Sequence, residues 1–323
     1  MPEIVEREHP VDVRELESCV RRYWEEANGD DERPLYRALT MNLIAVAPAD
    51  DESLLRATFH RLLRGNPCIA FLVLLRGDAR PLRASFGTLV EVGRNCRTVR
   101  LEQVTFWASP SERRRVPSLV RPLLVDDLPT QMFWSGGLTD DLRLLRELGG
   151  LANQIVYDSS LFADPDRDRA RIAELGMPAV DLVWLRLAPW RHTLAEAFEA
   201  IDWRDDLPVR AVVRFAGTAG TRAAGVVLGR WLETRLGATV ELVAIPRANA
   251  PSFEPCGVEI SVGDARIAID HCWPSPTLRA ATTLADRCLL PFTAVSRCAT
   301  RGDLLAAAAE SLGSVRPRAG DRP

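Results

Sequence analysis

Lysine is absent from this sequence of 323 residues, and all 41 basic side chains belong to arginine. Schiff-base chemistry, and a phosphate-binding loop completed by a lysine, are therefore excluded. The arginines are balanced by 44 acidic residues, which leaves a net charge of -3. A charge this close to neutral argues against a general nucleic-acid-binding protein.

Paired cysteines and long hydrophobic runs are also missing. The seven cysteines are widely spaced and form no CxxC pair, a pattern that fits reduced thiols better than a disulfide framework. No apolar run reaches the roughly 18 residues of a membrane span, and the polar, acidic start of the chain is unlike a signal peptide. We therefore expect a cytoplasmic protein with no membrane partner.

No catalytic constellation can be recognised in the sequence. The chain contains neither a GxSxG nucleophile elbow nor a GxGxxG dinucleotide fingerprint. Asp270, His271 and Cys272 are adjacent, but consecutive strand residues point to opposite faces of a sheet, so they cannot easily bind one metal ion. The cluster Arg113–Arg115 is typical of a solvated loop. We therefore expect no enzyme activity, no metal and no cofactor.

A glycine-rich segment, residues 217–225, lies between a predicted strand and a predicted helix, where a phosphate-binding loop would belong. Its spacing matches no known phosphate-binding fingerprint. The simpler interpretation is a tight turn in which Thr218 or Thr221 caps the helix. The alternative is an anion site that uses Arg222.

Apolar patterning predicts alternating strands and helices from Tyr36 onward, which is typical of a mainly parallel sheet covered by helices. Strands are predicted at 37–47, 68–75, 82–90, 99–107, 130–134, 154–157, 210–215, 239–245, 257–262 and 266–271. Helices are predicted after residues 48–51 and at 116–124, 142–151, 181–201 (one helix, or two interrupted at Pro189), 221–236, 279–289 and 303–312. The fold class is therefore α/β, with a Rossmann-like N-terminal sheet that has helices on both faces and a smaller α+β C-terminal domain.

Composition suggests four parts of the chain. Residues 1–34 carry eleven acidic residues and five arginines and are expected to form an acidic helix and linker, either simply solvated or a docking arm for a partner. Residues 35–165 form the Rossmann-like domain, residues 166–313 the α+β domain, and residues 314–323 a flexible tail.

One segment, residues 181–191, is rich in tryptophan and arginine. It contains Trp184, Arg186, Trp190 and Arg191 within eleven residues. On one helix Arg186 and Trp190 would lie a turn apart, which favours a cation–π contact. A packed core and a binding site explain the segment equally well. We predict that Trp190 is buried.

The two arginines of this segment require partners if they are buried, because an unpaired buried charge is costly. Within the segments 155–160 and 181–191 the acidic candidates are Asp158 and Asp181. We predict that Arg186 or Arg191 pairs with one of them and joins the two domains.

Four segments in order resemble the glucose-6-phosphate dehydrogenase assembly protein (OpcA) family. They are residues 41–46, residues 120–134 ending at Trp134, residues 155–160, and residues 181–191. Two features depart from the family pattern. Asn66-Pro67-Cys68-Ile69 stands where the family carries His-Pro-Ser-Arg, and Trp134 is followed by serine instead of a second tryptophan.

The resemblance implies a non-catalytic protein that binds glucose-6-phosphate dehydrogenase and promotes its active oligomer in the oxidative pentose phosphate pathway. Whether the chain also associates with itself is left open. The partner-binding or interdomain candidates within these motifs are Asp158, Ser159, Ser160, Asp181, Trp184, Arg186, Trp190, Arg191 and Trp134. An alternative from another class is a phosphosugar-binding enzyme or sensor, in which Arg186, Arg191, Asp158 and the loop 217–220 surround one pocket.

Overall fold

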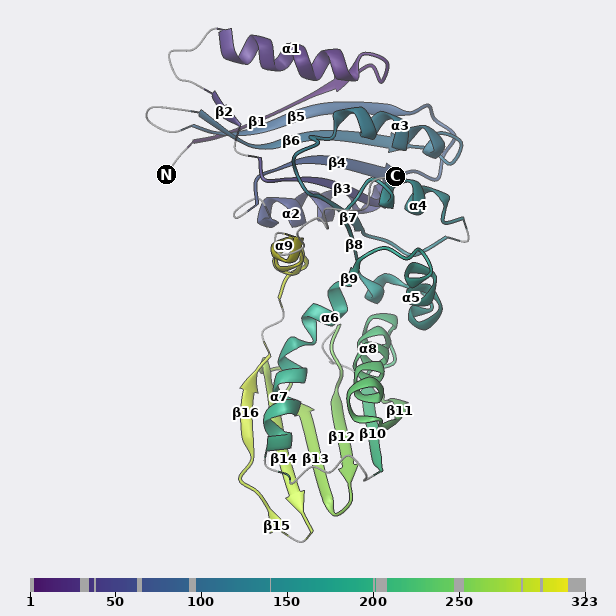
Figure 1. Ribbon diagram of the computed structural model, residues 1–323, viewed down its shortest axis with the longest axis vertical. Helices are drawn as coiled ribbons and strands as arrows, with labels where there is room; N and C mark the ends of the chain where they lie inside the picture. The colour runs from purple at the N-terminus through teal and green to yellow at the C-terminus, as the bar shows by residue number, and fades with distance from the viewer. Residues whose placement is uncertain are drawn as a thin grey trace, which may run out of the picture. The chain divides into compact units, whose positions relative to one another are not determined.

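A computed structural model of the chain divides into two compact units (Figure 1). The first contains Met1–Tyr157, Leu175–Val180 and Thr300–Pro323, and the second contains Asp158–Glu174 and Asp181–Ala299. The structure describes residues 3–29, 35–37, 39–62, 66–92, 97–139, 141–199, 201, 208–246, 253–285, 287–296 and 299–312. The expected tail at 314–323 and the end of the expected acidic linker lie outside the described residues.

The first unit is built on a nine-stranded sheet in the order β1-β5-β6-β4-β3-β7-β8-β9, with β2 beside β6. Its strands are β1 (Glu3–Val11), β2 (Leu35–Arg37), β3 (Met41–Pro48), β4 (Cys68–Leu75), β5 (Arg83–Val92), β6 (Arg97–Ala108), β7 (Thr130–Trp134), β8 (Gln154–Tyr157) and β9 (Ala179–Asp181). The pairs β6-β4, β4-β3, β3-β7 and β7-β8 are parallel, whereas β5 is antiparallel to β1 and to β6. The order β6-β4-β3-β7-β8 is that of a doubly wound sheet, which confirms the expected Rossmann-like fold class.

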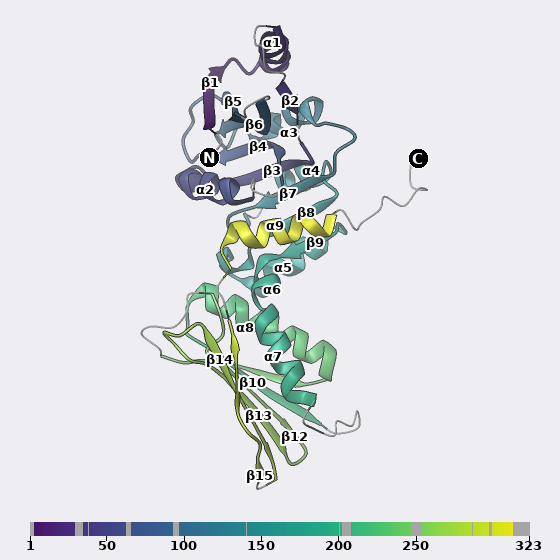
Figure 2. The same ribbon diagram turned by 90° about the vertical axis from the view of Figure 1, so that its left-hand side faces the viewer.

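Helices cover both faces of this sheet. They are α1 (Leu16–Gly29), α2 (Glu52–Leu62), α3 (Val116–Val120), α4 (Arg143–Gly149) and α9 (Arg301–Leu312). Figure 2 shows α2 on one side of the central strands and α3 and α4 on the other, and α9 packs against α2. Strands β3 and β4 are buried along almost their whole length, as expected for continuous apolar runs covered on both faces.

The N-terminal segment differs from the sequence prediction. The polar residues before the first helix form the edge strand β1, which is antiparallel to β5. The predicted helix is present as α1, and it is docked on the sheet, because the ring of Tyr23 meets that of Phe86 edge to face with centroids 5.2 Å apart. Pairing with β5 supplies the hydrogen bonds that make a strand of so polar a sequence.

The second unit is a seven-stranded sheet in the order β11-β10-β12-β13-β14-β15, with β16 beside β14. Its strands are β10 (Val209–Phe215), β11 (Thr239–Ala244), β12 (Gly257–Val262), β13 (Ala265–His271), β14 (Thr277–Leu284), β15 (Arg287–Cys288) and β16 (Phe292–Val295). Its helices are α5 (Pro165–Ala173), α6 (Leu182–Arg186), α7 (Ala188–Glu199) and α8 (Ala219–Leu236). Among the described strands of this second sheet, only β10 and β11 pair in parallel, so the α+β expectation is confirmed.

The helix predicted at 279–289 is wrong, because this stretch forms β14 and β15. Leu278 and Ala280 are buried while Arg279 between them is exposed, which is the two-residue period of a strand. Pairing with β13 overrides the helix propensity of the alanine and leucine residues.

Helix α8 begins with a tight turn and a threonine cap. This confirms the simpler interpretation of the glycine-rich segment 217–225. Gly217 has a positive φ of 66°, and Thr218 and Thr221 form a reciprocal capping box. This box satisfies the backbone N–H groups of Thr218 and Thr221. Helices α7 and α8 cover one face of the sheet, α7 over β13 and β14 and α8 over β10 and β11.

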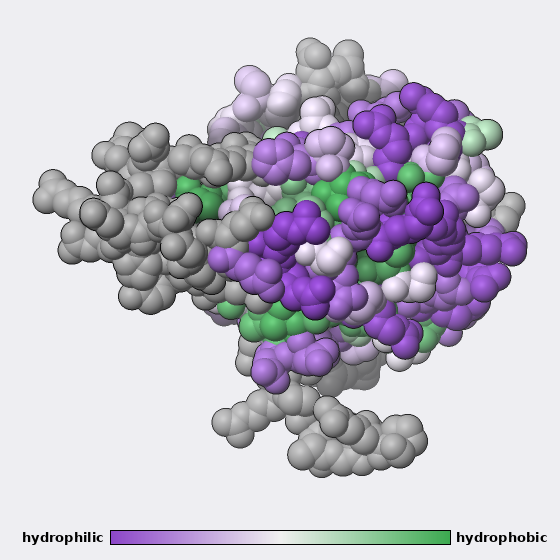
Figure 3. All heavy atoms as spheres, turned by 90° about the horizontal axis from the view of Figure 1, so that it is seen from above, coloured by the Kyte–Doolittle hydropathy of each residue, from purple (hydrophilic) through white to green (hydrophobic). Residues whose placement is uncertain are grey.

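Surface features add two observations. In the described part of the chain, no helix is both long and apolar enough to cross a membrane. The face seen in Figure 3 carries mostly hydrophilic side chains, with hydrophobic ones in small separate areas among the coloured residues.

Candidate functional site

The segment at 181–191 forms α6, whose N-cap is Asp181, and the first turn of α7. The side chain of Asp181 accepts a hydrogen bond from the backbone N–H of Val183 and so caps α6. Leu187 separates α6 from α7, and Pro189 lies in the first turn of α7, where a missing N–H group costs nothing. Of the two alternatives for this region, two helices are correct, but the break lies at Leu187 and not at the predicted Pro189.

Asp181 also ties the segment 158–160 to α6. Its carboxylate is buried and accepts hydrogen bonds from the backbone N–H of Ser159 at 3.2 Å and from the hydroxyl of Ser159 at 2.7 Å. The Nε atom of Arg169 lies 3.2 Å from Oδ2. Burial raises the pKa of Asp181 above its ordinary value, although these donors and the positive charge of Arg169 oppose the shift.

Asp158 and Arg186 form the ion pair that the sequence predicts, with Nη2 3.5 Å from Oδ2 and both side chains buried. The other carboxylate oxygen of Asp158 accepts hydrogen bonds from the backbone N–H and the hydroxyl of Ser160. The predicted link between two domains is wrong for this pair, however. Both residues belong to the second unit, because the chain enters that unit at Asp158.

The cation–π contacts differ from the predicted pair of Arg186 and Trp190. The guanidinium of Arg191 lies 3.3 Å from the ring centroid of Trp184, and that of Arg186 lies 5.0 Å from the ring centroid of Phe253. The predicted pair fails because the break between α6 and α7 removes the regular four-residue spacing. Burial lowers the pKa of Arg191, and its Nε is buried with no hydrogen-bond partner among the described residues.

Trp190 is fully buried, as predicted, and its indole points to a carboxylate that sequence reasoning missed. The Nε1 atom donates to Oε2 of Glu254 at 3.3 Å, and the hydroxyl of Ser296 donates to the same oxygen at 2.9 Å. The Nε2 atom of His271 lies 3.5 Å away from it. A single glutamate in Phe253-Glu254-Pro255 carries no pattern that would have revealed this cluster.

Burial raises the pKa of Glu254, against the opposing effects of Ser296, Trp190 and Arg186. The native state therefore binds a proton more readily than the unfolded chain. This contribution to stability is complete below the unfolded pKa, at about pH 4, and is lost as the pH rises through the higher folded value.

We expect Glu254→Gln to remove this loss of stability, because glutamine carries no ionisable proton. Melting temperatures of wild type and Glu254→Gln, taken from about pH 4 upward, measure the effect. Each unit by which the fold raises the pKa of Glu254 corresponds to about 1.4 kcal/mol of stability. The exposed Glu233→Gln is the control. Parallel pH profiles of wild type and Glu254→Gln would contradict the prediction.

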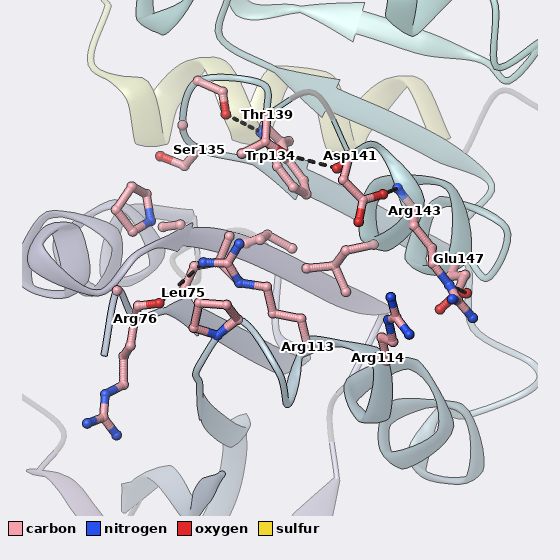
Figure 4. A pocket seen from close by; sticks show the side chains of 18 residues that line it. Leu75, Arg76, Arg113, Arg114, Trp134, Ser135, Thr139, Asp141, Arg143 and Glu147 are labelled. Atoms are coloured by element: carbon pink, nitrogen blue, oxygen red, sulfur yellow. Dashed lines mark hydrogen bonds and ion pairs between the residues drawn. The ribbon is translucent and has the colours of Figure 1, made fainter. Parts of the chain in front are cut away.

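Trp134 belongs to the first unit and is therefore not part of this cluster. It ends β7, is buried, and donates from Nε1 to the carbonyl oxygen of Gly137 at 3.4 Å. Together with Pro48 and Ser135 it lines a cavity of about 400 Å³ (Figure 4). A Cβ atom on Gly136 would lie 3.1 Å from Cδ of Pro48, so glycine permits the close passage of this loop.

The cavity lies at the carboxyl ends of β3 and β7, where the strand order of the sheet reverses. Doubly wound folds bind their ligands at this position, and dinucleotides need a glycine-rich turn there whose N–H groups hold the pyrophosphate. In this chain the turn after β3 carries Asp50, Asp51 and Glu52 at the start of α2. Glu52 is paired with Arg56 at 2.9 Å, but the turn has no glycine and Asp50 and Asp51 would repel a pyrophosphate, so it does not fit a dinucleotide.

Two family domains match the chain. Residues 63–174 match the domain described as glucose-6-phosphate dehydrogenase subunit N-terminal domain, and residues 177–298 match the corresponding C-terminal domain. The chain belongs to the OpcA glucose-6-phosphate dehydrogenase assembly family. The resemblance carried by the four sequence segments is thereby confirmed.

The relatives include proteins named as the OxPP cycle protein OpcA. The one from Nostoc punctiforme is 27% identical over 177 residues, which cover 53% of this chain and 38% of the relative. The one from Synechococcus elongatus is 28% identical over 179 residues, which cover 53% of this chain and 40% of the relative. The match thus spans about two fifths of the length of each relative.

Solved structures with a similar chain path include oxidoreductases. Levoglucosan dehydrogenase in complex with NADH and L-sorbose has a TM-score of 0.47 and 10% identity, with 85% of this chain and 88% of that chain covered. The 3-ketoreductase KijD10 from Actinomadura kijaniata has a TM-score of 0.45 and 12% identity, with 86% of this chain and 92% of that chain covered. Similarity this low says nothing about the activity of this chain.

Proposed function

We propose that this chain is a non-catalytic assembly subunit that binds glucose-6-phosphate dehydrogenase and promotes its active oligomer in the oxidative pentose phosphate pathway. Membership of the family and the names of its relatives support the partner and the pathway. The acidic turn at Asp50–Glu52 supports the lack of dehydrogenase chemistry, because its charge opposes the phosphates of a nicotinamide dinucleotide.

An activator of this kind acts through binding energy alone. It must bind the active form of the dehydrogenase more tightly than the inactive form, since equal affinity for both forms shifts nothing. Couplings between sites are typically about 1–3 kcal/mol, or roughly 5–150-fold in affinity. This is the range in which we expect the dehydrogenase to respond.

We infer that most of the motif residues at 158–160 and 181–191 stabilise the second unit and do not touch the partner. Asp158, Asp181, Arg186 and Trp190 are buried. Asp158 pairs with Arg186, Asp181 accepts from Ser159 and Val183, and Trp190 donates to Glu254, although Nη1 of Arg186 has no hydrogen-bond partner among the described residues. The phosphosugar pocket suggested for Arg186, Arg191 and Asp158 has less support for the same reason, because Asp158 already holds Arg186.

We expect the purified chain alone not to reduce NADP⁺. Added to the dehydrogenase from the same source, it should raise the rate at subsaturating glucose 6-phosphate and shift the enzyme to a larger oligomer. Initial rates and size-exclusion chromatography with light scattering measure the two effects.

The control for this assay is the same amount of heat-unfolded chain. Reproducible NADP⁺ reduction by the chain, after removal of contaminating dehydrogenase, would refute its non-catalytic nature. Unchanged kinetics and oligomeric state at several-fold excess of the chain would refute the activator role.

A further inference from the structure

The cavity at the carboxyl ends of β3 and β7 has an unusual charge distribution. Two arginines on its wall are neutralised: Arg76 holds Asp78 at 2.6 Å, and Arg143 holds Glu147 at 2.6 Å. In Figure 4 the side chain of Arg76 turns away from Trp134. These two guanidinium groups are therefore already satisfied by the chain itself.

Arg113 and Arg114 are different, because neither is paired with a carboxylate of the described residues. Both lie on the 3₁₀ helix Arg113–Arg115 that follows β6, and both line the cavity. Arg113 donates from Nη2 to the carbonyl oxygen of Arg76 at 3.2 Å, while its Nε is buried with no hydrogen-bond partner in the described part of the chain. Two adjacent uncompensated cations thus face one cavity.

The opposite part of the wall is suited to hydroxyl groups. Asp141 is an exposed carboxylate that accepts one backbone N–H, that of Arg143 at 2.9 Å. The indole of Trp134 lies between Asp141 and Ser135 in the lining (Figure 4). A carboxylate at this place disfavours a ligand that is anionic along its whole length and favours one with hydroxyl groups at the end away from the arginines.

We propose that this cavity binds a small hydroxylated metabolite that carries a phosphate or carboxylate group. Arg113 and Arg114 hold the oxyanion, since the planar guanidinium fork matches both groups, and Asp141 accepts hydrogen bonds from hydroxyl groups. A volume of about 400 Å³ lies within the range of small-molecule sites. The proposal is independent of the dehydrogenase, because it concerns the chain alone.

Isothermal titration calorimetry of the full chain at low ionic strength tests the site with four probes: glucose 6-phosphate, gluconate, glucose and inorganic phosphate. We expect saturable binding of glucose 6-phosphate or gluconate, and none of neutral glucose. Stronger binding of the phosphate ester would assign a phosphate, and stronger binding of gluconate a carboxylate. Both results support the proposal.

Variants of three neighbouring arginines make the test specific. Arg113→Gln and Arg114→Gln should each weaken binding about tenfold or more, as expected for the loss of a hydrogen bond to a charged group. Arg115→Gln is the matched control, because Arg115 follows them on the same 3₁₀ helix but is exposed, pairs with Glu112 at 2.6 Å and does not line the cavity.

Two outcomes would overturn the proposal. The first is that no anionic probe binds saturably to the full chain. The second is that Arg115→Gln weakens binding as much as Arg114→Gln, which would indicate attraction by the general surface charge. The side chain of Arg114 is exposed, so its variant stays informative even if Arg113→Gln disturbs the turn through its bond to Arg76.

Discussion

Replacing Trp190 with alanine is expected to lower the free energy of unfolding of the second unit by about 3–5 kcal/mol. Trp190 is fully buried in a hydrophobic cluster that includes Leu194, Val227 and Ile269. Truncation leaves a cavity that rigid neighbours on α8 and β13 cannot fill. It also removes the Nε1–H donor of Glu254, so a buried carboxylate loses one of its donors.

Urea denaturation followed by circular dichroism measures this loss. Trp190→Phe retains most of the volume but not the N–H group, and we expect it to cost about 1–3 kcal/mol. Leu290→Ala is the control, because the side chain of Leu290 is 93% exposed and should change stability by less than about 0.5 kcal/mol. A Trp190→Ala variant as stable as Leu290→Ala would show that this tryptophan is not part of the core.

The central strands of the first unit could be predicted almost residue by residue. The ranges 68–75, 130–134 and 154–157 are identical in the sequence prediction and in β4, β7 and β8. These strands are short apolar runs between breakers, and a parallel sheet buries such runs on both faces. Such apolar runs gain little from exposure to solvent, and they are short for a helix, so a buried strand is the favoured structure.

Strands β1 and β14 could not be predicted in this way. Strand β1 contains four charged residues, Glu3, Glu6, Arg7 and Glu8, and β14 is rich in alanine and threonine. Their local patterns favour other structures, and pairing with β5 and with β13 makes them strands. Pairing of this kind depends on context more than on intrinsic propensity.

The candidate sites also divide into those that the local sequence predicts and those that only the fold assembles. The ion pair of Arg186 with Asp158 was predictable because a buried arginine needs a counter-ion and the segments 155–160 and 181–191 offer Asp158 and Asp181. The cluster at Glu254 depends on residues from β13 and from Ser296, which only the fold brings together. Arg113–Arg115 resembles a solvated basic loop in sequence, and only the cavity beside β7 distinguishes Arg113 and Arg114 from Arg115.

Removing one partner of the buried pair Asp158–Arg186 is expected to cost about 3–5 kcal/mol of stability, because it strands an uncompensated charge. In Asp158→Ala the stranded group is a guanidinium whose side chain is 5% exposed. In Arg186→Met it is a fully buried carboxylate that loses its guanidinium partner and keeps the donors of Ser160. Both single variants should therefore unfold at clearly lower denaturant concentrations.

The double variant Asp158→Ala with Arg186→Met separates charge from packing. Well-packed apolar replacements of buried ion pairs are often close to neutral, so the double variant should lose less stability than the two single variants added together. Urea unfolding of all four proteins gives the coupling energy, for which contacting residues typically show about 0.5–3 kcal/mol. The exposed pair Arg230–Glu233, 67% and 41% exposed and 3.3 Å apart, is the control, and Glu233→Ala there should cost less than about 1 kcal/mol.

Simple additivity at Asp158 and Arg186 would mean that the two charges do not depend on each other. The pair would then owe its place to the serine and backbone donors around Asp158, and the tie between the segment 158–160 and α6 would rest on Asp181 alone.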